Sequence, residues 1–220
     1  KAKSLFKTLE KEGIVGAEGD IILNLLGVKL EISDKSAVGN LLQEWLGAWM
    51  SEHEVYHRSN ENSQMPPDFY LGKNDTKDLL EIKTFDYSKD PNFDIANFDA
   101  YVRDIQENPF RIDADYLIMG YSLKKGIIKI EKIWLKKVWE ISCPSNEYAI
   151  KTQVKQKKIY NIRPYNFKTN SKGFQPFQDR KSYVAAIKQT LEKYTRDKKG
   201  TERWFNALNE SYLKLTKNPL

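Results

Sequence analysis

The chain has 220 residues, 40% hydrophobic and 30% charged, which excludes both a disordered chain and a membrane-embedded one. Its single cysteine, Cys143, excludes an internal disulfide and a cysteine-rich zinc site. The formal net charge of +6 suits a polyanionic partner, because lysine and arginine release counterions when they bind phosphates. Lysine and arginine interleave with tyrosine and phenylalanine in residues 151–200, which is therefore the candidate partner-binding part.

The predicted elements begin with an amphipathic helix in KAKSLFKTLEKEG, which lacks the apolar core of a secretory signal. DIILNLLGVKLEI predicts a hairpin, and SAVGNLLQEWLGAWMSEH a helix with Asp34 or Ser36 as its N-cap. Strands follow in EVYHR, PDFYLG and LLEIKTF, then a helix in IANFDAYVRDIQ. ADYLIMGYSL and IIKIEKIWL predict neighbouring strands, and SYVAAIKQTLEKYTRD and TERWFNALNESYLKL two helices. This order predicts an α/β (α+β) fold with a mixed central β-sheet flanked by helices.

The segment PPDFYLGKNDTKDLLEIKTF carries the pattern most indicative of chemistry. Side chains alternate along a strand, so Glu81 and Lys83 share one face of LLEIK. A hairpin across KNDTKD would bring Asp68 beside them. Two carboxylates repel unless a cation lies between them, and oxygen ligands with open water positions suit Mg²⁺. The pattern thus indicates metal-assisted phosphodiester hydrolysis, although a solvated edge strand with an ordinary Glu–Lys pair also fits it.

This PD…EIK pattern resembles that of the PD-(D/E)xK nuclease superfamily, which includes many type II restriction endonucleases. GIVGAEGDI, QMPPDFYLG, LEIKTF and ADYLIMGYS occur in the order of comparable segments in the EcoRV-like branch, and the chain is also similar to enzymes of the NgoBV/NlaIV type. The resemblance implies a restriction-endonuclease-like core in which Asp68 and Glu81 bind Mg²⁺ and Lys83 is the catalytic lysine. It also implies a helical glutamate near the metal, for which Glu44 is the candidate, although Glu44 lies off the centre of the apolar stripe and fits a solvated position equally well.

The resemblance also places candidate DNA-binding residues. Gln64 falls where the EcoRV-like branch has a loop that approaches the minor groove, and the polar segment NFKTNSKGF resembles its recognition loop, although an ordinary surface loop fits as well. Basic side chains nearby suit phosphates, which position a protein without specifying sequence. The candidates for reading the DNA are Asn166, Lys168, Thr169, Asn170, Ser171 and Lys172, and those for the phosphates are Arg163, Arg180 and Lys181.

We therefore expect a single endonuclease domain over residues 1–220. In it, 1–35 would serve dimerisation, 36–150 catalysis and 151–220 DNA recognition. The expected protein is a homodimeric, Mg²⁺-dependent restriction enzyme that cuts double-stranded DNA at a short palindrome. We expect it to act in the cytoplasm of a prokaryotic cell and to have no membrane partner. The EcoRV-like resemblance implies blunt ends, and the NgoBV/NlaIV resemblance a site of the GGNNCC kind. Two alternatives stay open: a structure-specific repair nuclease or resolvase of the same fold, and a basic DNA-binding module without catalysis.

Overall fold

The computed structural model describes residues 1–62, 65–169 and 173–220. The chain forms two compact units, one from Lys1–Pro91 with Asp115–Lys136 and the other from Asn92–Ala114 with Lys137–Leu220. Each unit therefore combines two stretches that are distant in the sequence. In the described ranges, no helix has both the length and the apolar character needed to cross a membrane.

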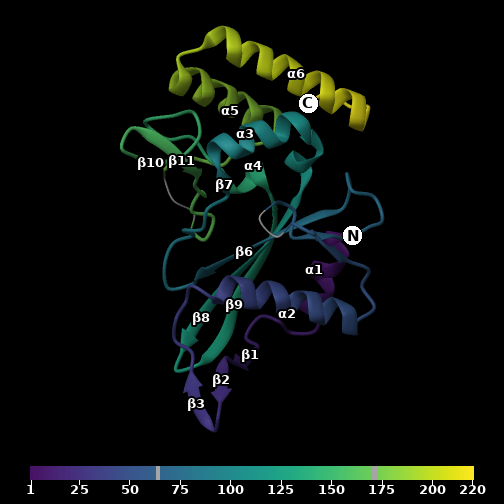
Figure 1. Ribbon diagram of the computed structural model, residues 1–220, viewed down its shortest axis with the longest axis vertical. Helices are drawn as coiled ribbons and strands as arrows, with labels where there is room; N and C mark the ends of the chain where they lie inside the picture. Colours follow the sequence, from purple (N-terminus) through teal and green to yellow (C-terminus); the bar gives the residue numbers. More distant parts are fainter. Residues whose placement is uncertain (63–64, 170–172) are drawn as a thin grey trace. The chain divides into compact units, whose positions relative to one another are not determined.

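The first unit is built on a six-stranded sheet with the order β1-β9-β8-β6-β5-β4. Figure 1 labels β1, β9, β8 and β6 of this sheet. β6 and β8 run parallel, whereas β5 is antiparallel to both β4 and β6, so the sheet is mixed as the sequence predicted. The strands of this sheet are β1 (Glu18–Asp20), β4 (Arg58–Ser59), β5 (Phe69–Tyr70), β6 (Leu79–Asp86), β8 (Asp115–Lys124) and β9 (Ile127–Lys137). The unit also contains α1 (Ala2–Lys11), α2 (Val38–Glu52) and a hairpin of β2 (Ile22–Leu25) and β3 (Val28–Glu31).

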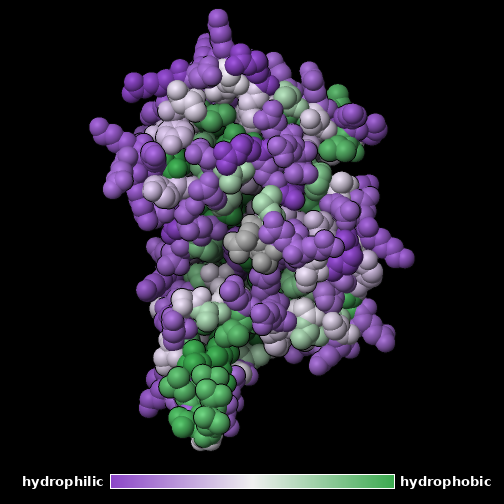
Figure 2. All heavy atoms as spheres, in the orientation of Figure 1, coloured by the Kyte–Doolittle hydropathy of each residue, from purple (hydrophilic) through white to green (hydrophobic). Residues whose placement is uncertain are grey.

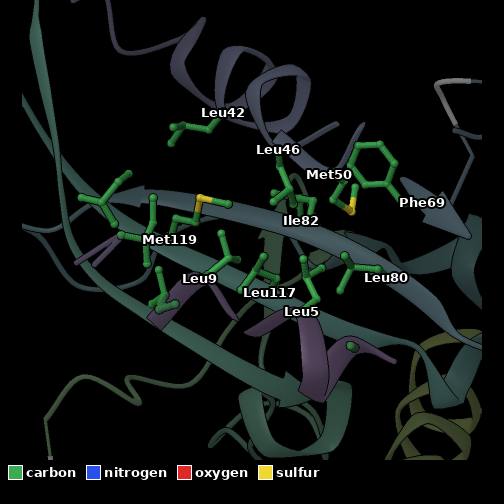
Figure 3. Packing of buried hydrophobic residues seen from close by; sticks show 14 of the residues in the cluster. Leu5, Leu9, Leu42, Leu46, Met50, Phe69, Leu80, Ile82, Leu117 and Met119 are labelled. Atoms are coloured by element: carbon green, nitrogen blue, oxygen red, sulfur yellow. The ribbon is translucent and has the colours of Figure 1, made fainter. Parts of the chain in front are cut away.

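The core of the first unit joins both helices to the sheet (Figure 3). In α2 the buried residues recur at every fourth position, which places them on one face of the helix. Each fully buried leucine contributes roughly 1.5–3 kcal/mol relative to an exposed one. The cluster includes Leu42, Leu46 and Met50 of α2, Leu5 and Leu9 of α1, and Leu80 and Ile82 of β6. Because side chains alternate along β6, Glu81 and Lys83 face away from this cluster.

The opposite face of β6 continues beyond Lys83 as an aromatic cluster. The rings of Phe85 and Trp134 stack with centroids 5.7 Å apart, and Tyr87 lies beside both. Gly120 of β8 pairs with Phe85, and a Cβ atom there would lie 2.7 Å from Tyr87 Cδ2. Glycine at this position therefore lets the aromatic rings lie close to the sheet backbone.

Two local predictions for the first unit were wrong. The N-cap of α2 is Ala37, without a side-chain cap, because Asp34 Oδ1 instead accepts a hydrogen bond from the Ser36 amide at 2.9 Å. The strand expected in EVYHR begins only at its last residue, since β4 spans Arg58–Ser59. The helix predicted after Ser36 and the strand predicted in PDFYLG are both present, as α2 and β5.

The β2–β3 hairpin exposes apolar side chains rather than burying them. Hydrophobic atoms gather over this hairpin in Figure 2, and Leu26 at its turn is 97% exposed. A patch of this kind on a surface indicates an interaction site. Its exposed apolar residues are Ile22, Leu23, Leu25, Leu26, Val28 and Leu30.

The second unit combines helices with a three-stranded sheet of order β10-β11-β7. Trp204 of α6 donates a hydrogen bond to the Val102 carbonyl of α3 at 2.9 Å, which ties the last helix to the first helix of the unit. The elements are β7 (Ala96–Asn97), α3 (Phe98–Glu107), the 3₁₀ helix η1 (Pro109–Asp113), α4 (Val138–Ile141), β10 (Thr152–Lys155), β11 (Lys158–Ile162), α5 (Arg180–Thr195) and α6 (Lys198–Thr216). The sequence predicted α3, α5 and α6, but not β7, β10, β11, η1 or α4. The helix expected in IANFDAYVRDIQ begins only at Phe98, since Ala96–Asn97 form β7.

Candidate active site

Asp68 lies beside Glu81 because β5 and β6 pair as an antiparallel hairpin. The pairs Phe69–Leu80 and Tyr70–Leu79 set the register, which places Asp68 across from Glu81 one position further on. Asp68 Oδ2 accepts a hydrogen bond of 2.6 Å from the Ile82 amide. The inferred hairpin is thus present, and it brings Asp68 to β6, the strand that carries Glu81 and Lys83.

The Glu81 carboxylate and the surrounding protein perturb the pKa of Asp68. Burial, together with the negative charge of Glu81, raises the pKa of Asp68 to about 7. Lys83 acts in the opposite direction, and its ammonium lies 3.0 Å from Glu81 Oε1. A buried group whose pKa is shifted by a specific neighbour is typical of a functional site.

One oxygen of this cluster has no partner within the described part of the chain. Glu81 Oε2 is buried and makes no hydrogen bond, whereas Oε1 faces Lys83. A buried carboxylate oxygen without a partner carries an uncompensated desolvation cost. The donor set here, two carboxylates and no histidine or cysteine, fits a hard cation that retains water ligands. No described group of three or more acidic, histidine or cysteine side chains is arranged to hold a metal ion.

Sequence reasoning missed Gln43, the α2 residue that contacts the cluster. Its side chain is hydrogen-bonded to Asp68, which lowers the pKa of that carboxyl and partly offsets the effect of burial. Glu44, the helical acid expected near the metal, is exposed one position further along. Both residues line a pocket of about 300 Å³ beside α2, together with His57, Ser59 and Phe69 among others. The helical pattern alone does not distinguish two neighbouring polar residues at the edge of an apolar stripe.

A second acidic residue on β6 is used within the first unit. Asp86 is buried and accepts a hydrogen bond from Lys35 Nζ at 2.5 Å and another from the Ser88 hydroxyl at 2.7 Å. These contacts, with Lys35 the largest contributor, lower the pKa of Asp86 to about 2. The ion pair ties the segment before α2 to the end of the strand that carries Glu81 and Lys83.

Both arginines predicted to contact phosphates have partners inside the second unit. Arg163 forms an ion pair with Asp94 and donates to the Asn92 carbonyl. Arg180 forms an ion pair with Asp113 at 2.7 Å, and its guanidinium lies over the rings of Trp139 and Tyr212. Lys181 is exposed at the start of α5.

The predicted recognition loop is described only in part. Asn166 is half-buried and its side chain accepts a hydrogen bond from the Lys168 amide at 3.2 Å, whereas Thr169 is exposed. Asn170, Ser171 and Lys172, and also Gln64, lie outside the described residues. The DNA-reading roles of all these residues stay predictions.

A mixed sheet flanked by helices, with Glu81 and Lys83 on β6 and Asp68 just before β5, is the arrangement expected of an enzyme of the restriction endonuclease class. A model of the family described as NgoBV restriction endonuclease matches residues 1–220, so the chain belongs to that family. It is 37% identical to the type II restriction enzyme NlaIV of Neisseria lactamica over 217 residues, which is 97% of this chain and 89% of that protein. It is 38% identical to the type II restriction enzyme NgoBV of Neisseria gonorrhoeae over 165 residues, 74% of this chain and 93% of that protein. The solved structure of an NlaIV restriction endonuclease superposes with a TM-score of 0.91 at 35% identity, covering 100% of this chain and 90% of that one.

These comparisons confirm the fold and the class of activity expected from the sequence. The chain is a type II restriction endonuclease, a hydrolase whose substrate is DNA. Neither the structure-specific repair nuclease nor the non-catalytic DNA-binding module is favoured. Of the two resemblances, the findings support the NgoBV/NlaIV type. Enzymes of this class generally need a divalent metal ion.

Proposed function

We propose that the enzyme hydrolyses phosphodiesters of double-stranded DNA with Mg²⁺ held by Asp68 and Glu81. The observation that supports this most is the buried Glu81 Oε2, which has no partner among the described residues and lies on the strand that binds Asp68. Mg²⁺ prefers one or two carboxylates together with water and substrate phosphate oxygens, which this donor set leaves room for. When bound, the ion would lower the pKa of a water ligand and offset negative charge on the scissile phosphate.

Each side chain of the cluster has a distinct role in this proposal. Asp68 and Glu81 would hold the metal ion, and the Ile82 amide, which donates a hydrogen bond to Asp68, keeps that carboxylate oriented. Lys83, at 3.0 Å from Glu81, presents an ammonium that can orient the attacking water or stabilise charge on the phosphate oxygens. Gln43 positions Asp68 from α2. Glu44 remains a candidate for a further contact to the metal or its waters.

The test of this site is a set of variants that keep shape and remove charge. Asp68→Asn, Glu81→Gln and Lys83→Met should each reduce Mg²⁺-dependent cleavage of plasmid DNA by at least about a hundredfold, because charge stabilisation at such sites contributes several kcal/mol. Circular dichroism and thermal unfolding would verify that the variants are folded. Full activity in any one of them would remove that residue from the mechanism.

We further propose that the working enzyme is a homodimer that cuts at a short palindrome. A two-fold DNA site cut on both strands matches a two-fold protein, and the exposed apolar β2–β3 hairpin within residues 1–35 is the surface proposed to join the copies. Leu23→Asp with Leu26→Asp should convert the dimer into a monomer in sedimentation experiments at low micromolar concentration. A wild-type protein that sediments as a monomer in the presence and absence of DNA would contradict the proposal.

The recognition role proposed for the second unit concerns residues 166–174 with Arg163, Arg180 and Lys181. Gln64, which belongs to residues 1–91, is proposed separately to approach the minor groove. The target proposed from the NgoBV/NlaIV resemblance is of the GGNNCC kind. Mapping the ends of fragments cut from DNA of known sequence tests the target, and blunt or staggered ends are read in the same experiment. We also infer that the enzyme acts in the cytoplasm of a prokaryotic cell, where restriction enzymes meet incoming DNA.

A further inference from the structure

The β10–β11 hairpin concentrates positive charge at its tip. The segment KTQVKQKKIYNI, residues 151–162, contains four lysines and no acidic residue. Lys155 and Lys158 are directly opposed in the ladder on either side of the turn, and both are exposed. Like charges in directly opposed positions destabilise a hairpin. This arrangement therefore opposes the stability of the free protein and suits a polyanion.

The β10–β11 turn has a side chain in the left-handed backbone region at a position where the β2–β3 and β8–β9 turns have glycine. The turns of β2–β3, β8–β9 and β10–β11 each have two central residues with positive φ, the pattern of a type I′ turn. The first two have glycine at the second position, Gly27 and Gly126, whereas β10–β11 has Lys157 with φ +65°. A side chain in the left-handed region is unfavourable, and glycine relieves it. The chain thus keeps a lysine at a position where the fold alone would favour glycine.

The tip presents these side chains without using them in the fold. In the ranges that the structure describes, the side chains of Gln156, Lys157 and Lys158 are exposed and have no hydrogen-bond or ion-pair partner. The base of the hairpin is anchored, since Ile159 and Ile162 are buried and β11 pairs with β7. The result is a firmly held two-stranded ribbon with free donors and acceptors at its end.

We propose that the tip of the β10–β11 hairpin enters the major groove of the DNA and contributes to choosing the cleavage site. The major groove admits a two-stranded β-ribbon, and lysine and glutamine are among the side chains that recognise guanine and adenine there. Gln156 and Lys157 contact base edges, while Lys155 and Lys158 contact the flanking phosphates. This inference rests on the DNA-cleaving function proposed above and adds a recognition element outside residues 166–174.

The turn geometry supplies a variant that separates function from folding. Lys157→Gly removes the side chain but relieves the strained φ, so its thermal unfolding midpoint should equal or exceed that of the wild type. Lys125→Gly is the matched control, because it removes an exposed lysine of positive φ from the type I′ turn of β8–β9. The two variants change the net charge equally.

Cleavage rates should be measured on the site mapped for the wild type and on sites that differ from it by one base pair. Lys157→Gly should slow cleavage of the mapped site by about 10- to 100-fold and reduce discrimination against at least one substituted site by a similar factor. Lys125→Gly should leave the discrimination unchanged. Wild-type rates and ratios in Lys157→Gly would overturn the inference, and a uniform loss at all sites would place Lys157 on a phosphate and overturn the base contact. A wild-type enzyme that cuts no DNA with any divalent metal would instead refute the proposed function.

Discussion

Replacing Asp68 with asparagine should stabilise the metal-free enzyme while eliminating cleavage. Burial and the nearby Glu81 carboxylate raise the pKa of Asp68 to about 7, so above that pH the folded protein holds a carboxylate in an unfavourable environment. Asparagine removes the charge and retains an oxygen that can accept the hydrogen bond from the Ile82 amide. A gain in stability combined with a loss of function is the signature of a charge kept for a ligand.

The size of the effect follows from the pKa shift. The pKa rises from 3.8 to about 7, and each unit corresponds to about 1.4 kcal/mol, so the upper limit is about 4 kcal/mol above pH 7. Below about pH 4 the group is protonated in both the folded and the unfolded state, and the penalty vanishes. Asp68 keeps partial access to water, so we expect about 2 kcal/mol, which raises the unfolding midpoint by about 4–8 °C.

Thermal unfolding in EDTA at pH 8 and again at pH 5 measures the difference in stability between the Asp68→Asn protein and the wild type. The Asp68→Asn protein should melt at a higher temperature at pH 8 and show a much smaller difference at pH 5. Exposed Asp90 provides the control, since Asp90→Asn changes the net charge equally at a site without this burial. Excess Mg²⁺ should raise the midpoint of the wild type but not that of Asp68→Asn. An Asp68→Asn protein that melts below the wild type in EDTA at pH 8 would refute the electrostatic argument.

The remaining predictions concern three residues of the first unit: Gln43, Glu44 and Lys35. Gln43→Ala removes a hydrogen bond that lowers the pKa of Asp68, so the acidic limb of the pH–rate profile should move to higher pH, with a rate loss of about tenfold at neutral pH. An acidic limb that does not move would exclude this contact. The pH–rate profile of Glu44→Ala tests the role proposed for Glu44 in the same way. Lys35→Met removes the ion pair with Asp86 and should lower the free energy of unfolding at pH 7. The expected loss is only about 1 kcal/mol, because the Lys35 side chain is partly exposed and water screens the pair. Since the pKa of Asp86 is lowered to about 2, this difference should be complete above about pH 4 and disappear as the pH falls towards 2, which urea unfolding at pH 7 and pH 3 would reveal.

The sequence predicted the parts of the site that depend on short-range periodicity. Glu81 and Lys83 share a face because strand side chains alternate, and Asp68 reached them through a hairpin whose strands were visible on both sides of a polar turn. Gln43 was missed because neighbouring helix positions differ by only about 100°, and the contact depends on how α2 lies on the sheet. A local pattern does not contain that placement.

The second unit was harder to predict for a different physical reason. The strands β10 and β11 are largely polar, and their turn is Gln-Lys instead of the Asn-Gly that usually marks a type I′ turn. The residues Asn92–Ala114 pack with Lys137–Leu220, which are distant in the sequence. Only long-range contacts determine this grouping, so residue composition along the chain did not reveal it.

The interleaving of the two units sets the rules for exchanging parts between related enzymes. The chain passes from one unit to the other after Pro91, after Ala114 and after Lys136. A chimaera made by joining two relatives at a single point within residues 92–136 would mix packing partners from different parents. Either α3 would come from one parent and α6 from the other, or β6 from one parent and its parallel neighbour β8 from the other. A transplant that preserves both cores must carry residues 92–114 and 137–220 together, as two inserts from the same parent.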